Sequence, residues 1–390
     1  MKVYLDNNAT TPLLPEVKQE IIESLEIFGN ASSKHSFGQR SREKVENSRK
    51  IIADYLNADP KEIIFTSGAS EGNNLVLKGV SSCGTTCSAL SCKPHIITTV
   101  IEHPSIANTA RCIEGLGGDI TYLKVGKDGR IDLEELKEKI RENTVLISVM
   151  WANNEIGTIQ PIKDIIAIAK EKGIKVHTDA VQVFGKMPID VKELGVDFLT
   201  FSGHKFNALK GTGGLYMRCA NHICPLIHGG HQEGMLRAGT ENSLGIISMG
   251  KALEINLQQK DSKRIAALRD DLEDFILKNI PNTYVNGSRE HRLYNTTNIS
   301  FEFIEGESLL LMLDHFGIAV STGSACSSDS LEASPVLTAL GVKEELAHSS
   351  VRFSLGPLNT QEEIDFVKEK LKFTVERLRA MSPLYNSSEM

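Results

Sequence analysis

Short apolar runs alternate with amphipathic helical stretches from about residue 60 to residue 220, and this alternation limits the possible folds more than any other feature of the sequence. Two clear helical patterns cover 132–141 and 161–172, and the second is followed by Gly173. Glycine is favoured after a helix because it accepts a positive φ. The predicted strands are Glu62–Thr66, His95–Val100, Asp119–Val125, Val145–Met150, Lys175–Asp179, Asp197–Phe201 and Gly214–Met217. The order predicts an α/β fold with a mostly parallel seven-stranded sheet and helices on both faces.

A chain of 390 residues is too long for one compact core, so two domains are expected. A long helical pattern over 244–279 is predicted to connect them and to end before Pro281. The remainder mixes predicted strands with a final helix that opens on a capping box, Thr360 with Glu363. We expect a large domain over 14–258 and a smaller α+β domain made of 1–13 and 259–390.

Charge and hydropathy exclude some classes of function. The net charge of −7 argues against nucleic acid as the main partner. No run of 18 apolar residues appears, so no membrane span is predicted. Residues 1–6 already read as a strand entering a turn and leave no room for a signal peptide, so a cytoplasmic protein is expected.

Three cysteines, Cys83, Cys87 and Cys92, lie in a polar segment rich in serine and threonine. Their spacing matches no standard zinc or iron-sulfur pattern, and no fourth ligand is evident. We interpret this segment as a surface loop rather than a metal site.

The run Ser202-Gly203-His204-Lys205 follows a predicted buried strand and places a lysine at its end. Burial disfavours the ammonium form and lowers the pKa of the amine, which makes Lys205 a usable nucleophile. Such amines form Schiff bases with carbonyl compounds, above all with pyridoxal phosphate. The alternative reading is an exposed loop lysine, which is the commoner situation for a single lysine.

Other polar residues follow neighbouring predicted strands. The Gly/Ser-rich run 66–71 precedes a predicted helix, whose N-terminus attracts a phosphate. An ordinary capped helix start has the same sequence pattern and is the alternative. Asp179 suits the protonated pyridine nitrogen of an electron-sink cofactor, and His103 suits ring stacking and proton transfer. The run 153–155 offers amide donors or a turn. Because ligands bind where parallel strands end, these groups are predicted to converge on one cofactor.

Two residues near the end of the chain are candidates for nucleophilic attack and for binding a substrate carboxylate. Cys326 lies in a loop of small polar residues, 321–328, where an accessible thiol can act as a nucleophile. Arg352, on a predicted strand, has the planar fork that binds a carboxylate, or else it is a partly exposed ion-pair residue.

Over nearly its whole length the chain resembles the cysteine desulfurases of the NifS/IscS type, which are class V pyridoxal-phosphate enzymes with the type I transferase fold. The matching motifs are Tyr4-Leu5-Asp6-Asn7-Asn8-Ala9-Thr10-Thr11-Pro12, Gly29-Asn30-Ala31-Ser32-Ser33, Glu102-His103, Asn153-Asn154-Glu155-Ile156-Gly157, Ser202-Gly203-His204-Lys205, Arg237-Ala238-Gly239-Thr240, Ser324-Ala325-Cys326 and Arg352-Phe353-Ser354-Leu355-Gly356. So many ordered matches exclude a chance likeness.

This resemblance implies a set of cofactor contacts. Lys205 would carry the Schiff base, Asp179 would pair with the pyridine nitrogen, and His103 would stack on the ring and transfer protons. The remaining cofactor contacts implied are Gln182 at the ring hydroxyl, Asn154, and the phosphate ligands Ala69, Ser70, Ser202 and His204, with Thr240 from the partner subunit of a homodimer.

The resemblance also implies the reaction. Asn154 and Arg352 would bind the carboxylate of L-cysteine, and Cys326 would take its sulfur, leaving alanine and a persulfide. The serine-rich stretch after Cys326 resembles the long mobile loop of family members that pass sulfur to a scaffold for iron-sulfur cluster assembly. Cys326 is also a candidate ligand for a transient cluster shared with that scaffold.

The chain departs from the family pattern at several loops, with Ala208-Leu209 where Gly-Pro is common, Gly234 after Gln232-Glu233, and Ala31 in place of proline. These departures bear on loop rigidity and partner choice. A related class V enzyme, either a selenocysteine lyase or an aminotransferase, and a non-catalytic sulfur-handling protein are the alternatives. Nitrogen-fixation and housekeeping roles use the same residues, so the sequence leaves the sulfur acceptor open.

Overall fold

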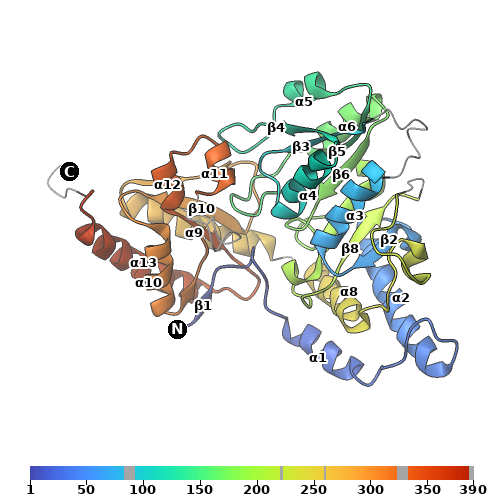
Figure 1. Ribbon diagram of the computed structural model, residues 1–390. Helices are drawn as coiled ribbons and strands as arrows, with labels where there is room; N and C mark the ends of the chain where they lie inside the picture. Colours follow the sequence, from blue (N-terminus) through green and yellow to red (C-terminus); the bar gives the residue numbers. More distant parts are fainter. Residues whose placement is uncertain (83–92, 220–222, 259–260, 323–332, 386–390) are drawn as a thin grey trace.

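A seven-stranded sheet forms the centre of the larger part of the molecule (Figure 1). The computed structural model describes residues 1–82, 93–219, 223–258, 261–322 and 333–385. The strand order is β2-β8-β7-β6-β5-β3-β4, and all neighbours are parallel except β8, which is antiparallel to β2 and β7. The strands are β2 Ile63–Thr66, β3 His95–Thr99, β4 Asp119–Leu123, β5 Thr144–Ser148, β6 Lys175–Asp179, β7 Phe198–Ser202 and β8 Gly213–Met217. The predicted mostly parallel seven-stranded sheet is confirmed.

Apolar side chains cover both faces of this sheet. Consecutive residues of one strand, such as Phe198 and Leu199 or Leu146 and Ile147, belong to different hydrophobic clusters, because successive side chains point to opposite faces. One cluster packs under α3 (Ala69–Ser82) and α4 (Pro104–Gly115). Such double coverage explains why these strands read as continuous apolar runs in the sequence.

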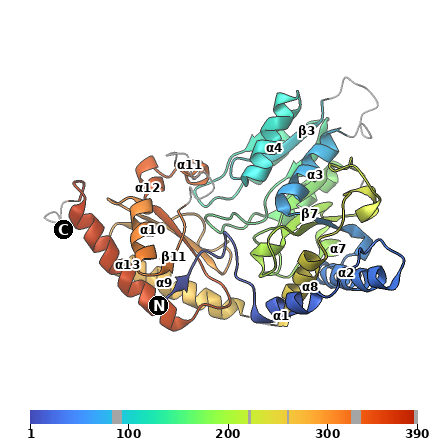
Figure 2. The same ribbon diagram turned by 60° about the horizontal axis from the view of Figure 1, so that its bottom comes forward.

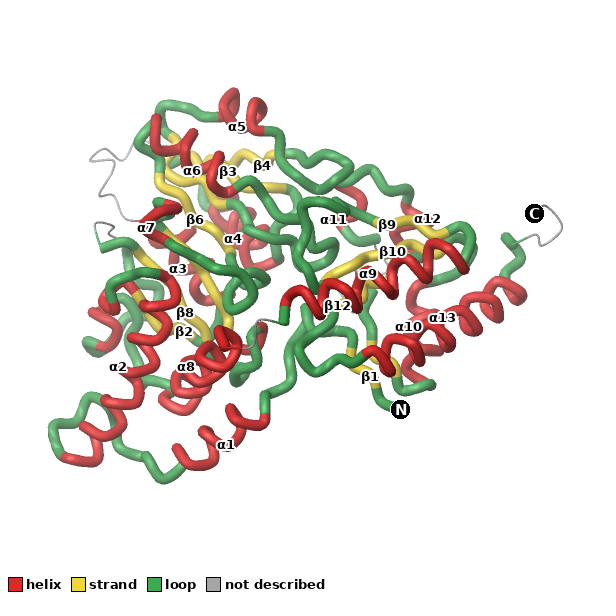
Figure 3. Tube along the Cα trace, turned by 180° about the vertical axis from the view of Figure 1, so that it is seen from behind, coloured by secondary structure: helices red, strands yellow, loops and turns green. Residues whose placement is uncertain are grey.

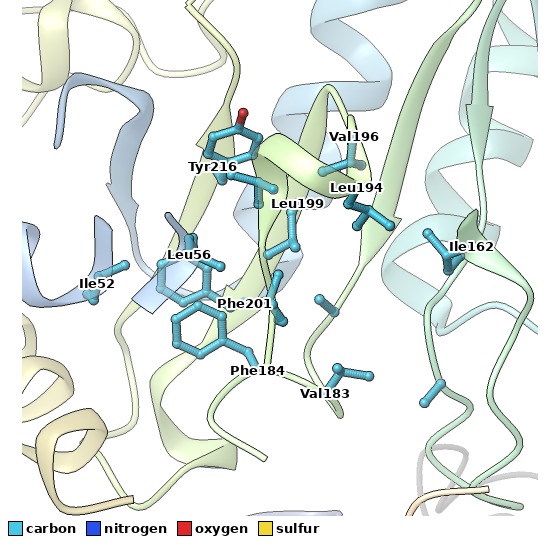
Figure 4. Packing of buried hydrophobic residues seen from close by; sticks show 14 of the residues in the cluster. Ile52, Leu56, Ile162, Val183, Phe184, Leu194, Val196, Leu199, Phe201 and Tyr216 are labelled. Carbon is cyan, nitrogen blue, oxygen red and sulfur yellow. The ribbon is translucent and has the colours of Figure 1, made fainter. Parts of the chain in front are cut away.

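The opposite face is covered by a larger cluster (Figure 4). The rings of Phe184 and Phe201 stack at 4.1 Å between centroids, beside Leu56 and Tyr216. The remaining helices of this part are α1 Pro15–Ser24, α2 Ser36–Leu56, α5 Leu133–Lys139, α6 Ile162–Glu171, α7 Val191–Leu194 and α8 Ser243–Gln258, with short 3₁₀ turns at Pro60–Glu62, Gly203–Lys205 and Gln232–Met235. Helices α1 and α2 both pack on α8.

The smaller part has its own sheet and core, and it holds both chain termini (Figures 1 and 2). An antiparallel sheet has the order β12-β10-β9, and a separate parallel pair joins β1 to β11. These strands are β1 Val3–Tyr4, β9 Thr283–Val285, β10 Thr296–Phe301, β11 Ile318–Ala319 and β12 Ser350–Ser354. The helices are α9 Ser262–Asn279, α10 Gly306–His315, α11 Pro335–Ala339, α12 Glu344–His348 and α13 Gln361–Met381. Val3 and Leu5 pack into this core, whereas Leu13 packs against the larger one.

The predicted single helix over 244–279 is wrong. The structure has two helices there, α8 ending at Gln258 and α9 beginning at Ser262, and α9 runs along the smaller part (Figure 3). Residues 258–264 are all polar, so the apolar spacing is interrupted at the break, and the prediction of one helix read across this interruption. The capping box at Thr360 is confirmed at the start of α13. No helix in the described part of the chain is long and apolar enough to span a membrane.

Candidate active site

Lys205 lies on a 3₁₀ turn that directly follows the buried strand β7. Its Nζ donates to the backbone carbonyls of Asn8 at 2.5 Å and Ala9 at 2.8 Å. The N-terminal segment is itself fixed to this turn, because Thr11 donates from both its backbone N–H and its hydroxyl to the carbonyl of His204. The amine is thus held beside the strand ends by groups remote in sequence.

Asp179 ends β6, the strand next to β7, and is almost fully buried. Its Oδ1 accepts the backbone N–H of Val181 at 3.0 Å, and its Oδ2 accepts the amide of Asn73 at 2.8 Å. Asn73, on α3, is completely buried. Two donors therefore fix the plane of the Asp179 carboxylate at the bottom of the site.

His103 is the N-cap of α4, and its Nδ1 accepts the backbone N–H of Ser105 at 3.1 Å. Burial lowers the pKa of His103; the charge of Asp179 raises it and that of Lys205 lowers it. The preceding residue, Glu102, is fully enclosed, and burial raises its pKa to about 8. Because its pKa lies below the ordinary value of 6.5, the His103 imidazole is neutral at neutral pH.

The N-terminus of α3 lies beside the end of β7. Gly68 has φ +155°, a conformation that side chains rarely adopt, and a Cβ built at Gly213 would come within 2.8 Å of its Cα. Ala69 and Ser70 occupy the first helical turn, whose N–H groups have no partner within the helix. His204 is kept neutral, because burial, helped by the nearby lysines, lowers its pKa to about 4.

Gln182 is buried and donates from Nε2 to the carbonyl of Asn8 at 3.0 Å, the same oxygen that accepts from Lys205. Its Oε1 accepts from Lys186 at 3.1 Å. Burial, with the charges of Lys205 and Arg352, lowers the pKa of Lys186 to about 7. Lys186 and Lys205 both line a cavity of about 1190 Å³ that does not include His103 or Asp179.

Arg352, on β12, brings the smaller part of the molecule to this site. Its guanidinium donates to the carbonyl of Asn154 at 2.9 Å and forms a 2.6 Å ion pair with Asp6. Its Nε is buried and has no hydrogen-bond partner among the described residues. A buried, unpaired guanidinium N–H is suited to donate a hydrogen bond to a ligand carboxylate.

The segment that carries Cys326 lies outside the described residues, as do Cys83, Cys87 and Cys92. The residues on either side of that segment are anchored near Arg352. Ser321 exchanges backbone hydrogen bonds with Arg352, and the Ser334 hydroxyl donates to Glu155 at 2.5 Å. Burial raises the pKa of Glu155 to about 7, while Ser334 and Arg352 oppose that rise.

The structure therefore brings most of the predicted residues together, but not all of them. Hydrogen bonds through Asn8 and Asn154 connect Lys205, Gln182 and Arg352. A second set through Asn73 and Ser105 connects Asp179 to His103, whereas Thr240 is exposed and follows the turn at Gln232–Met235. Within the described ranges, no group of three or more His, Cys, Asp or Glu side chains is placed to hold a metal ion.

Sequence reasoning missed several residues of this site. The carbonyls of Asn8 and Ala9 receive the Lys205 amine, and Asn73 and Ser105 connect Asp179 to His103. Asn73 lies on the same helix as the predicted phosphate loop and has the polarity of a helix surface, although it is buried. A carbonyl carries no side-chain signal, so the first contact becomes visible only in the structure, where Thr11 fixes the N-terminal segment to the turn of Lys205.

Comparisons with known proteins place these residues in context. The family model described as "Aminotransferase class-V" matches residues 3–367. The chain is 50% identical to "Cysteine desulfurase IscS" of Dictyoglomus turgidum and 49% identical to the protein of that name from Methanosarcina thermophila; each alignment covers 98% of this chain, and 96% and 94% of those proteins. A solved "NifS-like protein" has a TM-score of 0.90 at 38% identity and covers 97% of this chain and 100% of its own. A structure described as "SspA in complex with cysteine" has a TM-score of 0.81 at 36% identity, covering 92% and 100%.

Proposed function

This chain belongs to the class V aminotransferase family, and we infer that it is a cysteine desulfurase that uses pyridoxal phosphate and converts L-cysteine to L-alanine. The observation that carries this proposal is the convergence of a strand-end lysine, a buried carboxylate, a neutral imidazole and a buried arginine at one edge of the central sheet. Such a set of titratable groups has no structural purpose of its own.

The donor set fits pyridoxal phosphate. The buried Asp179 carboxylate suits a protonated ring nitrogen, and Lys205 supplies the amine for a Schiff base. Gly213 has no Cβ, which leaves room beside the N-terminal turn of α3 with Ala69 and Ser70. The N-terminus of a helix suits a phosphate. We propose that Ser202, His204, Gln182, Asn154 and His103 complete the contacts. When bound, the cofactor withdraws electrons from the substrate carbon.

We propose that Arg352 binds the substrate carboxylate. Its buried Nε lacks a partner among the described residues, and its other nitrogens are already fixed by Asp6 and Asn154. These two contacts orient the guanidinium before any substrate arrives, which lowers the entropic cost of binding. The cysteine-bound SspA structure, 36% identical to this chain, supports cysteine as the substrate.

We propose that Lys205 moves protons at the substrate carbon once its amine is released. The carbonyls of Asn8 and Ala9 then hold Nζ as an ammonium or an amine, because a carbonyl accepts a hydrogen bond from either form. Lys205 lies within electrostatic range of His103 and Lys186 and lowers the pKa of both groups.

The sulfur step is assigned to Cys326. Its thiolate attacks the sulfur of the substrate, an S–S bond forms, the substrate C–S bond breaks, and the electron pair stays with the carbon that ends as alanine. The product on the protein is a persulfide. We propose that this sulfur passes to a scaffold for iron-sulfur assembly, and that the enzyme acts as a cytoplasmic homodimer with Thr240 completing the partner's phosphate site. A reducing compartment suits thiolate chemistry.

Cys326→Ala tests this assignment. We expect the variant to lose persulfide formation and alanine production from L-cysteine, because no other thiol replaces the nucleophile. Cys219→Ala is the matched control, since Cys219 is a free and exposed cysteine; it should keep both activities. Undiminished sulfide and alanine release by Cys326→Ala would instead indicate a lyase of the selenocysteine type.

Absorption spectra separate either enzyme from a non-catalytic sulfur carrier. A Schiff base on Lys205 gives a visible band at about 400–430 nm. Borohydride should fix the cofactor covalently to the wild-type protein but not to Lys205→Ala. A folded wild-type protein that stays colourless after incubation with pyridoxal phosphate would contradict the proposed function.

A further inference from the structure

The hydrogen bonds around His103 define which of its ring nitrogens carries the proton. Nδ1 accepts the backbone N–H of Ser105 at 3.1 Å and lies 2.8 Å from the hydroxyl oxygen of the same residue. A backbone N–H can only donate, so Nδ1 must offer its lone pair. In a neutral imidazole the proton is then on Nε2.

The side chain of Asn73 sets the direction of the Ser105 hydroxyl. Its Nδ2 donates one hydrogen to Asp179 at 2.8 Å and the other to the Ser105 oxygen at 2.9 Å. Turning the amide over would place its oxygen against the Asp179 carboxylate, which is repulsive, so the orientation is fixed. Since Ser105 accepts from Asn73, its own hydrogen is left to point at Nδ1.

We propose that Ser105 and Asn73 are positioning residues that hold His103 in the tautomer protonated on Nε2, so that this imidazole meets the bound cofactor and substrate with a hydrogen-bond donor. The proposal rests on the assignment of His103 to the cofactor site. It deepens the proposed function, because a donor at Nε2 cannot remove a proton from substrate, which leaves that step to Lys205.

Protonation of His103 needs an acceptor at Nδ1, and the Ser105 hydroxyl is the neighbour that can supply one. A backbone N–H cannot reverse, whereas a hydroxyl can turn from donor to acceptor. The charged groups that act on the ring are Asp179, which favours the imidazolium, and Lys205, which opposes it. Glu102, the preceding residue, is neutral below its pKa of about 8.

Nitrogen NMR of the holoenzyme labelled with ¹⁵N-histidine reads the tautomer directly. His103→Gln identifies the signals, since the chain has 11 histidines. We expect Nε2 of His103 to show the protonated, pyrrole-like signal and Nδ1 the unprotonated, pyridine-like one. The reverse assignment would overturn the proposal. The desulfurase assay is independent, so loss of the proposed activity with the expected tautomer would reject the function and leave the hydrogen-bond relay intact.

Two variants should shift the pKa of His103 in opposite directions. Ser105→Ala removes the hydroxyl that can turn to accept from Nδ1, and a charge-assisted bond is about twice as strong as a neutral one, so the pKa of His103 should fall by about half a unit to one unit. Asn73→Ala frees the Ser105 oxygen to accept and leaves Asp179 less neutralised, so the pKa should rise by a similar amount.

Ser105→Thr is the matched control, because threonine keeps both the hydroxyl and the backbone N–H, and it should titrate like the wild type. A loosened, wetter site would move the pKa of both variants toward the ordinary histidine value. Shifts in the same direction, or no shift in either variant, would therefore contradict the proposal.

Discussion

Replacing Glu102 by glutamine should remove a loss of stability that the wild-type protein suffers as the pH rises. Glu102 is fully enclosed; its Oε1 accepts from Thr99 at 2.8 Å and from the backbone of Met150 at 3.0 Å, while its Oε2 has no partner among the described residues. Burial raises its pKa from 4.5 to about 8. The folded protein therefore holds a carboxylic acid that the unfolded chain would ionise.

The sign and size follow from linkage. Because the folded pKa is the higher one, stability is lost as the pH rises from the unfolded pKa of 4.5 to the folded pKa of about 8. At about 1.4 kcal/mol per unit, the penalty is about 2 kcal/mol near pH 6 and about 5 kcal/mol near pH 9. Glu102→Gln has no proton to lose, so its stability relative to the wild type should rise by about 2–3 kcal/mol between these two pH values.

Urea denaturation at the two pH values measures this difference, followed by circular dichroism and by the fluorescence of Trp151, the only tryptophan of the chain. Any fixed cost of fitting an amide into the site is the same at both pH values and cancels. Glu138→Gln, on the exposed side of α5, is the control and should show no such change. A Glu102→Gln difference that is constant with pH would refute the reasoning.

Three further changes have definite expected outcomes. Arg352→Lys should raise KM for cysteine about 10- to 100-fold with a smaller change in kcat, because lysine lacks the planar fork. Asp6→Asn should keep KM within about threefold in the same alanine assay. Equal KM values for the two variants would contradict this expectation. Glu273→Gln should lower the free energy of unfolding by about 1.5–3 kcal/mol, since it removes the charge-assisted contact of the buried Arg292 side chain at 2.5 Å and leaves the 3.6 Å ion pair with Asp270; a loss under about 1 kcal/mol in urea would be inconsistent with that. Gly185→Ala and Gly173→Ala both place alanine at positive φ, but only at Gly185 would the new Cβ meet another side chain, at 2.8 Å, so the Gly185 variant should have the lower melting temperature.

The sequence was sufficient to predict the large sheet and the strand-end lysine, aspartate and histidine. The strands of this sheet carry apolar residues on both faces, and the predicted His103, Asp179 and Lys205 lie at or shortly after the ends of β3, β6 and β7, so position in the chain is enough to locate them. The break between α8 and α9 coincides with a run of polar residues, 258–264, which the prediction of a single helix passed over, and the packing partner changes from one core to the other across it.

The contacts around the predicted side chains were also beyond sequence reasoning. Asn73 and Ser105 look like ordinary polar residues of two helices, and only the packing of α3 against α4 makes them neighbours. The same holds for Glu155 and Ser334, which are 179 positions apart. Long-range pairs of this kind depend on the tertiary arrangement, which local propensity does not encode.

The placement of the N-terminal segment also has a consequence for biosynthesis. Val3 and Tyr4 pair with β11, Asp6 bridges to Ser354, and the carbonyls of Asn8 and Ala9 receive Lys205. During synthesis this segment therefore waits for strands that follow it by more than 300 positions before it can pair. A nascent chain that already contains the whole seven-stranded sheet still lacks a finished lysine site, so the cofactor should be captured stably only after β11 and β12 have been made.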